Sequence, residues 1–194
     1  AVFTYWLRDE YQTLREQRHE REKAQKKAGQ DSFYPSWDSL RTEAGEEAPE
    51  IVLTVTDGAG NVVRRLKGSA DAGFHRVAWD FRWSSSEPAV IGTRTRGDWD
   101  DTPNGPLAVP GTYTVSLAKR VRGELTPLGQ PQQFVCEPLL QPSLPAANRD
   151  ELLAFSQKTA RLQRAVLGGS RVLGEMQSRL PLLAAALDEV TRPT

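Results

Sequence analysis

The chain has 194 residues, and its 25 lysines and arginines balance its 25 aspartates and glutamates, so the formal net charge is zero. This balance excludes a chain drawn to nucleic acid or to an anionic membrane by net charge. No apolar run approaches the roughly 18 residues that a membrane-spanning helix needs. The single cysteine, Cys136, excludes an intrachain disulfide and a cysteine-based zinc site.

The chain opens on a predicted strand. Residues 1–7 are rich in β-branched and aromatic side chains, which is typical of a strand. Because natural chains rarely start inside a strand, we expect that this chain was cut from a larger protein.

A highly charged helix is predicted next, over residues 8–28, which hold no glycine or proline. Its apolar stripe, Leu7, Tyr11 and Leu14, covers two turns and then ends. We therefore expect the first half to dock and the second half to project into solvent. A basic helix can also bind nucleic acid or a membrane surface, but the interleaved acidic residues favour a solvated helix.

A second, short helix is predicted from Trp37 to about Ala44. Ser36 is a suitable N-cap because its hydroxyl can accept from backbone N–H groups of the first turn. Trp37 and Leu40 are three residues apart and are expected to anchor the helix. Residues 8–49 thus form a predicted helical insertion.

From Ile51 the apolar period changes to two, which indicates strands. Residues 51–56 and 62–66 form a predicted hairpin around the glycine-containing turn at residues 57–61. That turn superficially resembles a calcium loop, but it has too few oxygen-bearing side chains, and the hairpin interpretation is favoured.

Further strands follow the hairpin. In residues 73–81 the alternation places His75, Val77, Trp79 and Phe81 on one face. Three more strands are predicted, at residues 112–118, 125–128 and 132–136. About seven strands in a mainly β chain with α appendages indicate an immunoglobulin-like β-sandwich, formed by residues 1–7 and 50–137.

The last quarter of the chain predicts a proline-rich linker over residues 138–147 and one long helix over residues 148–191. Asn148 is the expected N-cap, with Glu151 in the capping-box position. Gly168 and Gly169 invite a break into a helical hairpin, but a turn there would have no reason to preserve the apolar phase. We therefore expect one helix, with a kink at Pro181.

A heptad stripe runs along this helix at alternating spacings of three and four residues, interrupted only at Thr159 and Gly169. Its large apolar members are Leu152, Phe155, Leu162, Val166, Leu173, Met176, Leu180, Leu183, Leu187 and Val190. Such a repeat is typical of a coiled-coil seam. The seam needs a partner, which is another copy, a helix beyond Thr194 or the body of the parent protein; self-association is favoured.

Few residues indicate chemistry. His19 and His75 lie far apart in sequence, without companions at metal-ligand spacing, and Cys136 has the surroundings of a buried strand residue. There is neither a glycine-rich phosphate loop nor a nucleophile elbow. We therefore predict no catalytic residue, no metal and no cofactor.

One acidic segment has the character of a ligand site. Asp98, Trp99, Asp100 and Asp101 combine three carboxylates, which could serve calcium, with an aromatic ring that could stack on a sugar. Flexible acidic loops without a ligand are common, and a single aromatic ring does not make a carbohydrate platform.

Three segments carry a family resemblance: residues 57–66 (DGAGNVVRRL), 73–80 (GFHRVAWD) and 109–115 (VPGTYTV). Together they resemble the immunoglobulin-like module of the flagellar-hook-capping type. Residues 1–7 (AVFTYWL) and 162–166 (LQRAV) resemble the C-terminal region of sortilin-like, BNR-repeat β-propeller proteins, which are often labelled glycosyl hydrolases.

The resemblance implies that a propeller precedes this region and holds any hydrolytic chemistry, so no catalytic residue can be carried over. It also implies a secreted or periplasmic parent. We expect a non-catalytic structural and interaction module that buttresses the parent propeller and mediates assembly, with no nucleic-acid partner and no membrane insertion. The alternative is a carbohydrate-binding accessory module of a glycosidase that uses Trp99 and its acidic loop.

Overall fold

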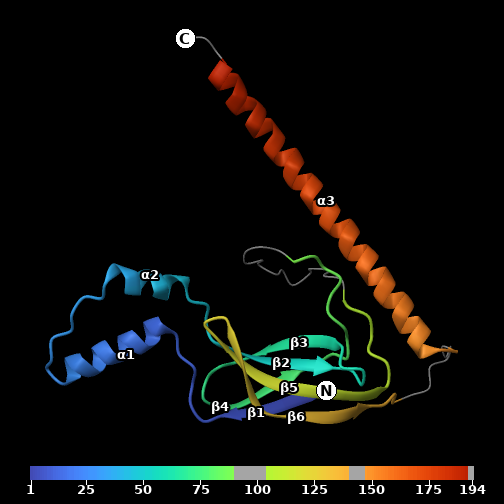
Figure 1. Cartoon of the computed structure of the whole chain (residues 1–194), viewed down its shortest axis with the longest axis horizontal. Helices are drawn as coiled ribbons and strands as arrows, with labels where there is room; N and C mark the ends of the chain where they lie inside the picture. Colours follow the sequence, from blue (N-terminus) through green and yellow to red (C-terminus); the bar gives the residue numbers. More distant parts are fainter. Residues whose placement is uncertain (90–103, 140–146, 192–194) are drawn as a thin grey trace. The chain divides into compact units, whose positions relative to one another are not determined.

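The computed structural model (Figure 1) describes residues 1–89, 104–139 and 147–191, and the chain divides into two compact units. The first unit comprises residues 1–81 and 110–139, and the second comprises residues 82–109 and 140–194. The elements are β1 (Val2–Leu7), α1 (Leu14–Lys27), α2 (Trp37–Gly45), β2 (Glu50–Thr56), β3 (Val62–Gly68), β4 (Gly73–Ala78), β5 (Gly111–Val121), β6 (Glu124–Cys136) and α3 (Arg149–Thr191).

The predicted order of elements is confirmed: a strand, short helices, further strands in antiparallel sheets and a long last helix. The described residues contain six strands, however, and not about seven. The two strands predicted at residues 125–128 and 132–136 are one 13-residue strand, β6. Its two internal prolines are tolerated because β6 lies at the edge of its sheet, where a missing N–H donor leaves no partner unpaired.

Two antiparallel sheets make up the body of the first unit. One contains β1 and β4, and the other has the order β3-β2-β5-β6 (Figure 1). Their inner faces meet in a core where Tyr5 and Leu7 of the first sheet pack against Ile51 and Leu53 of the second. Burial of these alternating side chains supplies the main driving force for packing the sheets together.

An aromatic cluster continues this core. Trp79 is buried, and its ring makes an edge contact with Tyr113 at 5.4 Å between centroids; Phe3 contacts Phe134 at the same distance. The inward face predicted for residues 73–81 is confirmed for His75, Val77 and Trp79. It is wrong for Phe81, because β4 ends at Ala78 and the backbone of Phe81 turns to a φ of 57°, which leaves its ring exposed. Such edge contacts add to the free energy of burial because ring edges and faces carry opposite partial charge.

The turn between β2 and β3 matches the hairpin interpretation of residues 57–61. Asp57 Oδ1 accepts from the backbone N–H groups of Ala59 and Asn61, at 3.0 and 2.8 Å. Gly60 adopts a φ of 84°, a conformation that glycine reaches without steric cost. The carboxylate that a calcium loop would direct to the ion is therefore used by the turn itself.

The first helix starts later than predicted, at Leu14 and not at residue 8. Thr13 Oγ1 accepts from Glu16 N at 3.2 Å and Glu16 Oε2 accepts from Thr13 N at 2.8 Å, which closes a capping box. This reciprocal pair of hydrogen bonds fixes the start of the helix, whereas helix propensity alone predicts an earlier start. Tyr11 lies before the helix, packs against the core and donates its N–H to Ala70 O at 3.0 Å.

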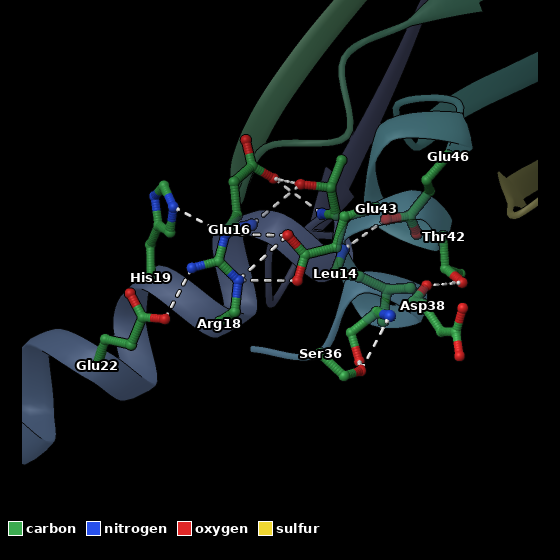
Figure 2. Close-up of polar contacts among 12 residues, drawn as sticks. Leu14, Glu16, Arg18, His19, Glu22, Ser36, Asp38, Thr42, Glu43 and Glu46 are labelled. Carbon is green, nitrogen blue, oxygen red and sulfur yellow. Dashed lines mark hydrogen bonds and ion pairs between the residues drawn. The ribbon is translucent and has the colours of Figure 1, made fainter. Parts of the chain in front are cut away.

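The two short helices are joined by an ion pair (Figure 2). Arg18 of α1 lies between Glu22 and Glu43, and its Nε is 2.8 Å from Glu43 Oε1. The predicted cap of α2 is confirmed, since Ser36 Oγ accepts from Ser39 N at 3.3 Å. The predicted anchor is wrong for Trp37, which is 77% exposed. Carboxylates, and not this apolar ring, hold α2.

The helical pair is also tied to the sheet. Glu46, which ends α2, accepts from the backbone N–H of Leu14 at 2.6 Å and pairs with Arg122 at 3.3 Å. Arg122 belongs to the tight turn between β5 and β6 and has a φ of 51°. One buried carboxylate therefore joins the start of α1, the end of α2 and the β5–β6 turn.

Candidate interaction surface

The long helix α3 dominates the second unit. It runs unbroken for 43 residues through Gly168, Gly169 and Pro181, so the prediction of one helix rather than a helical hairpin is confirmed. Asn148 caps it as predicted, because its Oδ1 accepts from the backbone N–H groups of Asp150 and Glu151 at 3.0 and 3.2 Å. At 1.5 Å per residue its length is about 64 Å.

The predicted heptad stripe is exposed along the whole of α3. Each of its ten large apolar residues is more than half exposed, from 53% at Leu152 to 82% at Val190. The interruptions lie where the sequence places them, with the Thr159 hydroxyl donating back to Phe155 O at 3.0 Å and Gly169 leaving open space. The result is a continuous apolar surface on one side of the helix.

The other side of α3 holds residues 85–88, which we call the docked segment. Arg164 donates to Ser85 O at 2.6 Å, and seven residues further on Arg171 lies 3.6 Å from Glu87 Oε1. Ser86 is fully buried and its hydroxyl donates to Gln163 Oε1 at 2.6 Å. Positions 164 and 171 lie opposite the stripe on the helical wheel, whereas Gln163 lies beside it. The apolar side chains of the stripe stay exposed with the segment in place.

A close approach of backbone chains precedes the docked segment. Trp83 N donates to Pro106 O at 2.8 Å, and Arg82 pairs with Leu107 in an isolated bridge. A Cβ atom at Gly105 would lie 2.0 Å from Trp83 O, so only glycine fits there. Sequence reasoning missed both this bridge and the docked segment, because neither shows an apolar period.

The histidines and the cysteine occupy structural positions. His75 is half-buried, stacks on Tyr5 at 5.2 Å between ring centroids and donates from Nε2 to Asp71 O at 2.8 Å. Exposed His19 lies 3.2 Å from an Arg18 nitrogen. Burial raises the pKa of the Cys136 thiol at the end of β6, which disfavours the nucleophilic thiolate.

A cavity of about 640 Å³ opens between the start of α1 and the β3–β4 connection. Polar side chains line much of it, among them Glu10, Glu16, His19 and Asp71. Within the described residues, no three histidine, cysteine or carboxylate side chains come close enough together to hold a metal ion.

The acidic segment Asp98, Trp99, Asp100 and Asp101 lies outside the described residues.

An aromatic pair that sequence reasoning missed lies on the outer face of the β1–β4 sheet. Trp6 and Phe74 are cross-strand partners, both exposed, with ring centroids 6.4 Å apart. Strand alternation alone could have indicated the pair, since Trp6 and Phe74 point away from Tyr5 and His75.

No family model, curated protein or solved structure matches the chain. The family resemblance therefore stays a prediction. In the described part of the chain, none of the helices has both the length and the apolar character needed to cross a membrane.

Proposed function

We propose that the chain is a non-catalytic interaction module that assembles through the apolar stripe of α3. One observation carries the proposal: ten large apolar side chains, each more than half exposed, follow a single heptad line over the full length of the helix. Continuous apolar surface of this extent is typical of a protein interaction site.

The area of the stripe suits a partner helix. At about 25 cal/mol per Å² and roughly 1.5–3 kcal/mol per side chain, ten fully exposed side chains would offer roughly 600–1,200 Å² of apolar surface. At their exposure of 53–82% they offer roughly 400–700 Å². Each partner in a standard specific interface contributes about 800 Å². The straight heptad phase also suits a second helix better than a flat or globular surface, because knobs at this spacing fit the holes of another helix.

The occupant that we propose is a second copy of this chain. A second copy supplies an equally long stripe with the same phase, whereas the docked segment already covers the opposite side of α3 within the same chain. A closed pair of identical helices is the simplest arrangement that covers both stripes at once.

The first unit would serve as the rigid body of this module. We propose that its two sheets form the immunoglobulin-like sandwich of the resembled family and buttress a propeller in an exported parent protein. The buried contacts between the two sheets support a body of this kind, because they make the unit able to hold a fixed shape.

Sedimentation equilibrium on the full chain tests the assembly. We expect a monomer–dimer equilibrium, with the dimer favoured at high concentration. Leu162→Glu should shift the chain to monomer, since a carboxylate in the seam would be buried without a partner. A wild-type chain that stays monomeric at the highest soluble concentration would contradict the proposal.

Carbohydrate binding is a second candidate function, supported by the exposed aromatic pair Trp6 and Phe74. Affinity electrophoresis through soluble polysaccharides tests it. A chain that is retarded, and that loses retardation in Trp6→Ala or in Trp99→Ala, supports the function and locates the platform. Equal migration with and without polysaccharide contradicts it.

A further inference from the structure

We propose that the two copies of α3 pair antiparallel, around a two-fold axis at the level of Arg171. This inference rests on the proposed function, since it specifies how the assembly is built. It comes from the order of large and small residues along the exposed stripe.

The stripe is self-complementary when the direction of one helix is reversed. Its first position is Leu152 and its last is Val190, so the midpoint is residue 171, and reversal about this midpoint returns every stripe position to another stripe position. The facing pairs are Leu152 with Val190, Phe155 with Leu187, Thr159 with Leu183, Leu162 with Leu180, Val166 with Met176 and Gly169 with Leu173. No stripe residue is left without a counterpart.

Thr159 and Gly169, the two stripe positions without a large apolar side chain, decide between the orientations. In a parallel pair in register, Gly169 would face Gly169 of the second copy and Thr159 would face Thr159, which leaves one empty layer and one polar layer. In the antiparallel pair each faces a leucine, so every layer contains at least one large apolar side chain. Packing of small against large side chains avoids the void that destabilises a core.

Spin labels on the full chain test the orientation. In a Cys136→Ser background, a label is placed either at Ser178→Cys or at Ala185→Cys, which are the same heptad position on the side away from the stripe. Double electron–electron resonance then measures the distance between labels in the dimer. In the antiparallel pair, moving the label from 178 to 185 lengthens that distance by roughly 15 Å or more, because each label moves further from the axis.

The two outcomes are distinct. A longer distance at 185 than at 178 supports the antiparallel pair, and equal distances at the two positions overturn it in favour of a parallel pair while leaving the assembly itself intact. Sedimentation of the same labelled chains gives their size. A monomer contradicts the proposed function, and an assembly of three or more copies contradicts the two-helix pairing.

Discussion

Arg18 is the residue that joins the two short helices. Its guanidinium donates from Nε and Nη2 to both oxygens of Glu43, at 2.8 to 3.1 Å, and from Nη1 to Glu22 at 2.7 Å. These bonds hold the pKa of Glu43 below its ordinary value of 4.5 and raise the pKa of Arg18. A planar guanidinium suits this fork, and lysine would not replace it.

The docking of α1 on α2 should therefore weaken in acid. A carboxylate whose pKa is depressed in the folded state contributes stability above its unfolded pKa and loses it as the pH falls through the folded pKa. Amide hydrogen exchange of residues 14–27 and 37–45, expressed as protection factors, should show reduced protection below about pH 4.5. Glu43→Gln should lower protection already at pH 7 and flatten this pH dependence. The exposed Glu20→Gln is the matched control, and equal profiles for the two variants would exclude this role for Glu43.

Two glycines should respond oppositely to alanine. Gly174 lies inside α3, and a Cβ atom added there would meet open space, so Gly174→Ala should stabilise the helix by about 0.5–1 kcal/mol. Gly105→Ala places a methyl group against Trp83 O and should destabilise the second unit. Urea denaturation followed by circular dichroism measures both. A destabilised Gly174→Ala chain would contradict the helical environment assigned to it.

At the scale of elements, the docked segment depends on three polar side chains of α3, Gln163, Arg164 and Arg171. Ser86→Ala removes one hydroxyl donor from a fully buried site and should cost about 1 kcal/mol in docking. Hydrogen exchange of residues 84–89 should accelerate in this variant, while β2 and β5 keep their protection. Unchanged exchange would show that Ser86 does not hold the segment.

Elements with a regular period could be predicted from the sequence, and elements held by single polar contacts could not. The 3.5-residue and two-residue apolar periods indicated α3 and the strands, because apolar side chains repeat along one face of each element. The start of α1 was missed because a hydrogen-bonded pair, Thr13 with Glu16, fixes it. The continuity of β6 was missed because its prolines suggest a break that an edge position tolerates.

The same distinction between periodic features and single polar contacts applies to the candidate site. The stripe of α3 could be predicted in full, since heptad spacing is a property of the sequence alone. Its exposure could not, because that depends on which side of the helix takes the docked segment, and the contacts of Ser86 and Arg171 have no periodic signal. The pairing of Arg18 with Glu43, 25 residues apart, cannot be predicted from the local sequence pattern either.

At the scale of the whole molecule, assembly depends on a stripe that is open in the single chain. Most helical stability in proteins comes from packing of an amphipathic face, and every described residue from 172 to 190 is exposed. We therefore expect the helicity of this part to rise with protein concentration as the stripe becomes covered. Circular dichroism at 222 nm over a concentration series measures it, and a signal per residue independent of concentration would contradict coupled pairing.

The most direct test compares two leucines that are two residues apart on α3. Leu180 lies in the stripe and is 62% exposed, and Leu182 lies outside it and is 70% exposed. Sedimentation equilibrium should show that Leu180→Glu weakens the dimer by roughly 100-fold or more, the cost of burying an unpaired carboxylate, while Leu182→Glu leaves it nearly unchanged. Equal effects of the two substitutions, or no effect of either, would contradict assembly through the stripe.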